Sequence, residues 1–161
     1  MAMNFARTLS AFALLSGCGA EAVEFAVDDM LAAHNAVRLE YGVAALSADV
    51  VLADTALEWS RQLSADGCDL VHSEGEYGEN LYWTSATATP EEVVTAWASE
   101  VADYDLGTHT CAEGAVCGHF TQVVWANTTT VGCGSAVCAD GGEVWTCEYD
   151  PPGNYVGETP F

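Results

Sequence analysis

The order of apolar and polar positions along the chain predicts helices in the first half and strands in the second. A first helix is expected over Val27–Tyr41. Asp28 and Asp29 suit the positive end of a helix dipole, and Gly42 stands where a C-capping glycine belongs. This pattern predicts one helix before any strand.

Two further helices follow. Ser47 can cap a helix over Ala48–Ala65, which ends before Gly67 and has one broad apolar face, made of Val51, Leu52, Thr55, Ala56, Trp59 and Leu63. The run Thr89-Pro90-Glu91-Glu92 combines a threonine cap, a proline at the first helical position and a glutamate at the third. It predicts a third helix that ends near Ala102.

The remaining chain is dominated by turn residues and short apolar runs. Cys68–Trp83 is expected to form strands and loop, and Asp103–Gly118 to form loop. Three strands are predicted in the C-terminal part: Gln122–Ala126, Thr130–Val137 and Glu143–Tyr149. Asp140-Gly141-Gly142 should join the last two as a hairpin. Helices followed by strands predict an α+β layered domain.

Seven cysteines are many for 161 residues, and their spacing indicates disulfides. No C-x-x-C pair of the kind that zinc sites contain occurs, and the nearest pairs are Cys133/Cys138 and Cys111/Cys117. Disulfides form in oxidising compartments, so the sequence predicts an extracytoplasmic protein.

The N-terminus agrees with export. Residues 1–18 hold an early positive charge and a short apolar run, too short to span a bilayer, that ends in Leu15-Ser16-Gly17-Cys18. This tetrapeptide resembles a bacterial lipobox. We therefore interpret residues 1–18 as a lipoprotein signal peptide, Cys18 as the lipidated anchor in the bacterial envelope and residues 19–25 as a short tether. The alternative is an ordinary signal peptide cleaved near Ala20.

The charge is strongly acidic, with 24 Asp and Glu against three arginines and a formal net charge of −21. Such a surface repels nucleic acids and anionic headgroups, so a nucleic-acid-binding function is excluded. Solubility or adaptation to high salt explains the imbalance. Adsorption of divalent cations is the functional alternative.

Six motifs carry a resemblance to a known family. In chain order they are His34-Asn35-x-x-Arg38, His72-Ser73 with Tyr77-Gly78-Glu79-Asn80-Leu81, Trp97-Ala98-Ser99-Glu100, Gly118-His119-Phe120-Thr121-Gln122-Val123-Val124-Trp125, Val131-Gly132-Cys133 and the run from Trp145 to Tyr155. Together they resemble the CAP superfamily: cysteine-rich secretory proteins, antigen 5 and pathogenesis-related class 1 proteins. The plant members are the most similar, down to Gly67–Ser73.

The resemblance implies one CAP (SCP) domain over residues 26–161, folded as a disulfide-stapled three-layer α-β-α sandwich. It also implies one pairing of the six cysteines that remain after Cys18: Cys68–Cys138, Cys111–Cys117 and Cys133–Cys147. Lipidation of Cys18 leaves this even number.

The resemblance further implies a cleft lined by His72, Glu79, Glu100 and His119. Neutral imidazoles suit zinc or another divalent cation, and carboxylates can add a ligand or activate bound water. We therefore predict His72 and His119 as metal ligands and expect Gln122 to orient the His119 ring. The alternative is a hydrogen-bonded polar cluster without metal.

Four more polar residues are expected to be structural or peripheral. The resemblance implies that His34 packs and hydrogen-bonds rather than binding a ligand. Asn35 and Asn80 are expected to satisfy buried backbone groups. His109, beside Cys111, is expected to face solvent.

Three functions remain open. The first is a non-enzymatic binding module for lipid, sterol-like or envelope ligands. In sterol-binding relatives the contact loop precedes the G-H-F-T-Q motif, which corresponds here to Tyr104–Val116. The second is a metal-dependent, peptidase-like hydrolase with Glu79 or Glu100 as general base. The third is a passive interaction domain. Because this family shares its fold more than any reaction, we favour binding by a monomer.

Overall fold

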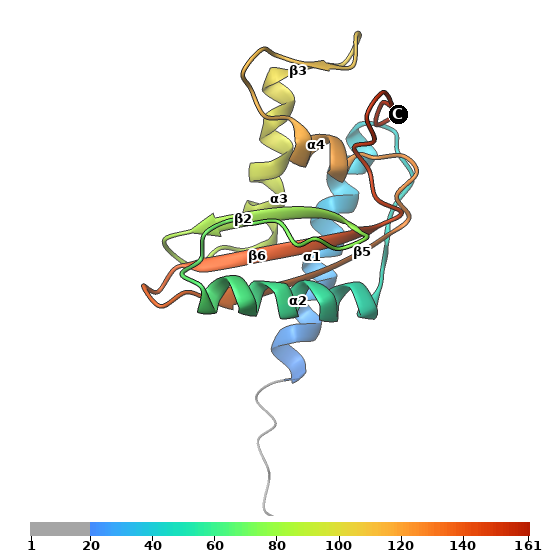
Figure 1. The fold of residues 1–161 in the computed structure, drawn as a ribbon. Helices are drawn as coiled ribbons and strands as arrows, with labels where there is room; N and C mark the ends of the chain where they lie inside the picture. The colour runs from blue at the N-terminus through green and yellow to red at the C-terminus, as the bar shows by residue number, and fades with distance from the viewer. Residues whose placement is uncertain (1–19) are drawn as a thin grey trace, which may run out of the picture.

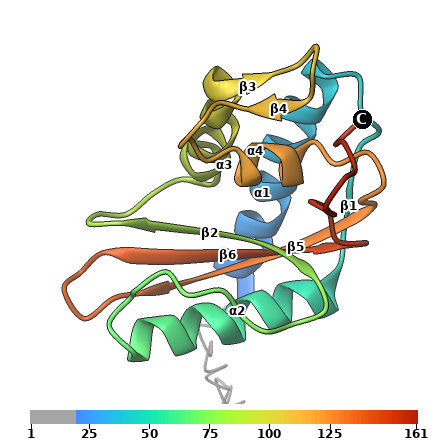
Figure 2. The ribbon, with the colours of Figure 1, turned by 45° about the horizontal axis from the view of Figure 1, so that its top comes forward.

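A four-stranded sheet lies between two layers of helices in the computed structural model, which describes residues 20–161 (Figure 1). Helix α2 (Val50–Ala65) covers one face of the sheet. Helices α1 (Ala20–Glu40), α3 (Pro90–Ala98) and α4 (Gly118–Val123) lie on the other side (Figure 2). The predicted three-layer α-β-α sandwich is confirmed.

The interpretation of residues 1–18 as a signal peptide, with Cys18 as its lipidated end, falls outside the described residues. Most of the predicted tether at residues 19–25 belongs to α1, which begins at Ala20 rather than at Val27. Between residues 20 and 161, none of the helices combines the length and the apolar character needed to cross a membrane.

The central sheet has the strand order β1-β5-β6-β2. Strands β2 (Gly78–Thr84), β6 (Glu143–Asp150) and β5 (Thr130–Val137) are antiparallel, and the short β1 (Ser47–Ala48) runs parallel to β5. The predicted β5–β6 hairpin is confirmed. A separate two-stranded ladder, β3 (Tyr104–Asp105) with β4 (Thr110–Cys111), occupies the segment predicted as loop.

Helix α2 packs closely on the sheet because two glycines of β5 leave room for its backbone. A Cβ atom at Gly132 would overlap Leu52 and Ala53, and one at Gly134 would overlap Leu57. The hydroxyl of Ser60 on α2 donates a hydrogen bond of 2.9 Å to the Gly134 carbonyl. The helix therefore sits nearer to the sheet than larger side chains in β5 would allow.

The larger core lies on the opposite face, where α1, α3 and α4 meet the sheet. Its buried members are Met30, Leu46, Val93, Val94, Trp97, Phe120, Val123, Val124, Val131, Trp145, Cys147 and Tyr149. They come from both halves of the chain, so this core forms only when the helical half packs on the strands.

Helix α3 starts as the sequence predicts. The Thr89 hydroxyl accepts a hydrogen bond from the Glu92 N–H at 3.2 Å, and the Glu92 carboxylate accepts one from the Thr89 N–H at 2.8 Å. This capping box satisfies two amide groups that a helix start leaves free. The helix continues beyond Ala98 as a 3-10 helix, η1 (Ser99–Asp103), close to the predicted end at Ala102.

Two local predictions were wrong. Asp49, not Ser47, caps α2 and accepts hydrogen bonds from the first amides of the helix, while Ser47 pairs in β1. The stretch 122–126, predicted as a strand, instead contains the end of helix α4 and the turn after it. Its run of buried apolar residues has no polar face, and periodicity alone does not separate a short buried helix from a strand.

All three predicted disulfides are present. Cys68–Cys138 joins the end of α2 to the β5–β6 turn, Cys133–Cys147 links directly paired residues of β5 and β6, and Cys111–Cys117 closes a short loop before α4. The described cysteines are therefore fully paired, and none is left as a nucleophile.

Candidate functional site

His119 and Glu100 form the first of two histidine–carboxylate pairs. The His119 Nδ1 atom lies 2.6 Å from Oε1 of Glu100. The other carboxylate oxygen accepts the backbone N–H groups of His119 and Phe120, at 2.9 and 3.1 Å. Glu100 thus fastens the start of α4 to η1 and holds the imidazole through one nitrogen. The ring of Trp97 stacks beside His119, with 6.4 Å between the centroids.

His72 and Glu79 form the second pair. The His72 Nδ1 atom lies 2.5 Å from Oε1 of Glu79, and the Ser73 N–H donates to both carboxylate oxygens at 3.1 and 3.3 Å. The His72 side chain is 62% exposed, whereas that of Glu79 is 6% exposed. A buried carboxylate therefore positions an imidazole that solvent or a ligand can reach.

Both pairs determine which ring nitrogen is open to a ligand. A carboxylate accepts a hydrogen bond, so Nδ1 of each neutral ring carries the proton and Nε2 carries the lone pair. Within residues 20–161, neither Nε2 atom has a hydrogen-bond partner. Histidines that bind metals show this same arrangement, with a carboxylate on the second nitrogen.

Asn80 connects the two pairs. It follows Glu79 in β2 and donates hydrogen bonds to the His119 carbonyl at 3.1 Å and to the Tyr149 hydroxyl at 3.2 Å. The four predicted cleft residues nevertheless stand as two pairs: in the described chain, no group of three His, Cys, Asp or Glu side chains is close enough to hold a metal ion. Each pair leaves one imidazole nitrogen with a lone pair, which is a type of donor that divalent cations accept.

Sequence reasoning missed Glu148, which faces Glu79 directly across the β2–β6 pairing. Glu148 is 1% exposed, and its Oε1 atom has no partner among the described residues. Burial, together with the charge of Glu79 and a hydrogen bond to it, raises the pKa of Glu148 to about 8. The available signal was a carboxylate between Cys147 and Tyr149, in the interior of a strand that is predicted from its apolar residues.

His34 has the structural role that the resemblance implies. Its Nδ1–H donates to the Met30 carbonyl at 2.7 Å, so Nε2 accepts from the Tyr149 hydroxyl at 2.8 Å. Burial is the main cause that lowers its pKa to about 4, and Arg38 adds to it. His34 is therefore a neutral hydrogen-bonding residue of the core.

The two asparagines also satisfy backbone groups as expected. Asn35 pairs with both backbone groups of Leu46, through hydrogen bonds of 2.7 and 3.1 Å. Asn80 holds the His119 carbonyl. Each side chain joins a helix or strand to a segment distant in sequence.

Gln122 and His109 differ from expectation. The amide of Gln122 accepts the Gly153 N–H at 3.0 Å and donates to the Thr128 hydroxyl at 3.3 Å, so it holds the C-terminal segment rather than the His119 ring. His109 is half-buried, not solvent-facing, because its ring packs edge-on against Phe161 with 5.5 Å between centroids.

The loop 104–116 has little apolar surface to offer a lipid. Tyr104 is half-buried and turns its ring toward Phe120, with 5.6 Å between the centroids. Leu106 and Val116 are its exposed large apolar side chains.

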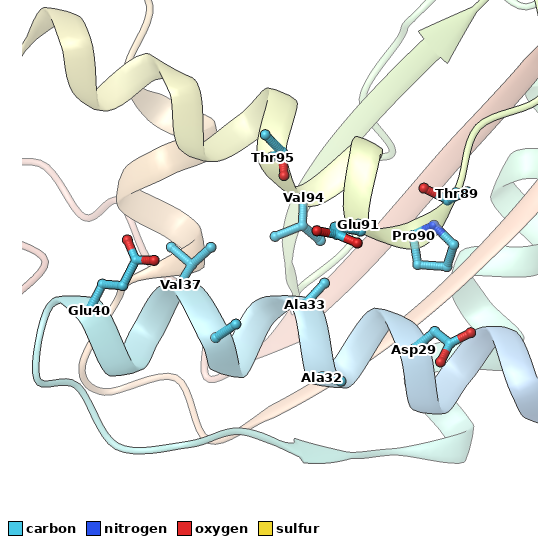
Figure 3. A pocket seen from close by; sticks show the side chains of 11 residues that line it. Asp29, Ala32, Ala33, Val37, Glu40, Thr89, Pro90, Glu91, Val94 and Thr95 are labelled. Atoms are coloured by element: carbon cyan, nitrogen blue, oxygen red, sulfur yellow. The ribbon is translucent and has the colours of Figure 1, made fainter.

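A groove of about 580 Å³ lies elsewhere, between α1 and α3. Val37 and Val94 point into the space between the two helices (Figure 3). Alanines of α1 complete this apolar lining, and three carboxylates, Asp29, Glu40 and Glu91, also line the groove. Its shape and lining suit an apolar ligand without a negative charge.

Comparison with known proteins gives a family match. The family model "Cysteine-rich secretory protein family" (CAP) matches residues 31–149. "Pathogenesis-related protein 1A" of Nicotiana tabacum is 49% identical over 134 residues, which are 83% of this chain and 79% of that protein. The predicted similarity to plant pathogenesis-related proteins is thereby confirmed.

Solved structures share the fold at lower identity. "Crystal structure of NaASP2 with Zn2+" superposes with a TM-score of 0.73 at 23% identity, over 90% of each chain. Venom allergen-like protein 4 of Schistosoma mansoni gives a TM-score of 0.69 at 20% identity, over 84% of this chain and 93% of that one. These plant and helminth relatives lend no support to the assignment of a bacterial lipoprotein.

Proposed function

Because this chain belongs to the cysteine-rich secretory protein family, we propose that it is an extracytoplasmic, non-enzymatic binding protein for a neutral, sterol-like lipid. The observation that carries this proposal is the groove between α1 and α3. Burial of an apolar ligand against its alanine and valine lining would be favourable, at about 25 cal/mol per Å². The acidic residues Asp29, Glu40 and Glu91 disfavour a fatty-acid carboxylate.

A groove-filling substitution tests this proposal. We expect the full chain to bind a fluorescent sterol saturably, and oleate more weakly at low salt. Ala36 is exposed in the groove, so Ala36→Trp should weaken sterol binding at least tenfold. Leu39→Trp is the matched control, because Leu39 lies on the same helix, is 78% exposed and does not line the groove. Equal sterol binding by both variants would contradict the proposal.

A second proposed ligand is a divalent cation at His72 and His119. The observation that favours it is the free Nε2 atom of each ring beside a carboxylate-held Nδ1. The cation would supply a positive charge and polarise a coordinated oxygen atom. The similar NaASP2 crystal structure was solved with Zn²⁺, which agrees with this proposal.

Calorimetric zinc titration of the full chain would test the cation site. We expect saturable binding that the double variant His72→Ala/His119→Ala loses. His109→Ala is the control, since this histidine packs against Phe161 outside the two pairs. Zinc binding that is equal in all three proteins would assign the ion to the acidic surface and refute the site.

Both glutamates of the alternative hydrolase are already engaged as hydrogen-bond acceptors. Glu100 holds the His119 ring and two backbone amides, and Glu79 holds His72 and Ser73. A general base needs a lone pair directed at its substrate, so this arrangement favours binding over catalysis. Peptidase activity that Glu100→Gln abolishes without unfolding the protein would reverse this conclusion.

Location and partners are proposed from the sequence alone: anchoring through a lipidated Cys18, a monomeric state and no nucleic-acid partner. Mass spectrometry of the N-terminal peptide after expression in a bacterium would test lipidation. An unmodified N-terminus near Ala20 would instead indicate an ordinary signal peptide.

A further inference from the structure

A separate pocket of about 250 Å³ lies between α2 and the segment that leads into β2. Trp59 and Tyr77 supply aromatic side chains to it, Glu58 and Glu76 add carboxylates, and Glu148 lines it from β6. The groove between α1 and α3 contains none of these residues. The pocket is therefore a candidate site that differs in its chemistry from this groove.

Glu148 is the feature of this pocket that points to a ligand. Thr146, two residues before it in β6, hydrogen-bonds Ser60 of α2, so Glu148 also projects toward the α2 side of the sheet. The Glu148 residue is 1% exposed, yet Oε1 has no hydrogen-bond partner among residues 20–161. Buried polar atoms are nearly always paired, so an acceptor left open in a pocket indicates a missing donor.

The lining selects a positively charged donor. None of the residues that line the pocket is basic, and Glu79 lies across the strand pair from Glu148. Aromatic faces attract ammonium groups, and the formal net charge of −21 favours cations over anions throughout the chain.

We propose that this pocket binds a primary ammonium group, on a small alkylamine or a lysine side chain. Oε1 of Glu148 accepts a hydrogen bond from the ammonium group, while Trp59 and Tyr77 flank its alkyl chain and charge. The pocket shares no lining residue with the groove between α1 and α3.

Calorimetric titration of the full chain with n-pentylamine and with 1-pentanol tests the proposal. The two ligands have the same alkyl chain, but pentylamine carries an ammonium group where pentanol carries a neutral hydroxyl group. We expect saturable binding of pentylamine and at least tenfold weaker binding of pentanol. Nα-acetyl-lysine N-methylamide distinguishes the two sources: tighter binding of this compound than of pentylamine assigns the ligand to a polypeptide. Equal binding of pentylamine and pentanol, or no binding of either amine, overturns the proposal.

Three variants locate the site. Glu148→Leu removes the acceptor and should weaken pentylamine binding at least tenfold, whereas Glu113→Gln removes an exposed carboxylate outside the pocket and should leave affinity within twofold of wild type. Tyr77→Ala, at an exposed position, should weaken binding about threefold and keeps the test decisive if Glu148→Leu does not fold. If the folded Glu148→Leu variant, or the Tyr77→Ala variant, binds pentylamine with wild-type affinity, the assignment of amine binding to this pocket is overturned.

Discussion

Replacement of Glu148 by glutamine should stabilise the fold at neutral and alkaline pH. The pKa of Glu148 rises from 4.5 to about 8 on folding, first because of burial and then because of Glu79. The folded state therefore holds a proton that the unfolded chain releases. The contribution of protonated Glu148 to the free energy of unfolding is fully present below pH 4.5 and is lost as the pH rises through about 8.

The size of the effect follows from the pKa change. At about 1.4 kcal/mol per tenfold change in proton affinity, the whole rise corresponds to at most about 5 kcal/mol above pH 8. Glu79, which provides part of the shift, pairs with the exposed His72, so solvent screens part of this interaction. We expect Glu148→Gln to be more stable than wild type by about 2–3 kcal/mol at pH 8.5 and by less than about 0.5 kcal/mol at pH 4.5.

Urea unfolding, followed by tryptophan fluorescence without reductant, measures this difference. Urea is preferred to a guanidinium salt, which would screen the charges. Glu113→Gln provides the control, because it removes an exposed carboxylate and should follow the wild-type pH profile. Parallel stability profiles of wild type and Glu148→Gln between pH 4.5 and 8.5 would refute the reasoning.

Three further predictions concern the core. Burial lowers the pKa of His34 from 6.5 to about 4, so the neutral ring stabilises the fold fully above pH 6.5. At pH 4 the unfolding free energy should be lower by about 3 kcal/mol because of this group. His34→Gln should therefore lose less stability, measured by urea unfolding, between pH 7 and pH 4. Gly134→Ala should lower the unfolding free energy by at least about 2 kcal/mol, since its Cβ overlaps α2. Arg38→Met leaves four backbone carbonyls without their donor and should cost at least about 3 kcal/mol, measured by urea unfolding at pH 7.

Elements with a local signal were predictable from the sequence. The capping box placed the start of α3, and alternating residues around a glycine turn placed the β5–β6 hairpin. Helix α4 was not predictable in this way, because Glu100, nineteen positions before His119, accepts its first amides. The short α4 therefore depends on a contact that its own residues do not encode.

The candidate site was also predictable from the sequence only in part. Motif resemblance identified His72, Glu79, Glu100 and His119, but their spacing along the chain did not predict two separate pairs. Glu148 lies within the motif that runs from Trp145 to Tyr155, but the motif resemblance implied no role for it. It became a candidate only when the β2–β6 pairing placed it opposite Glu79 and α2 covered it.

The sequence by itself determined the family, the order of most helices and strands and the cysteines available for pairing, because capping, turns, periodicity and motifs are properties of neighbouring residues. The tertiary structure decided which nitrogen of each imidazole stays open, where the groove and the pocket lie and which carboxyl group holds its proton. These properties depend on burial and on distances between residues far apart in sequence, which the folded chain alone sets.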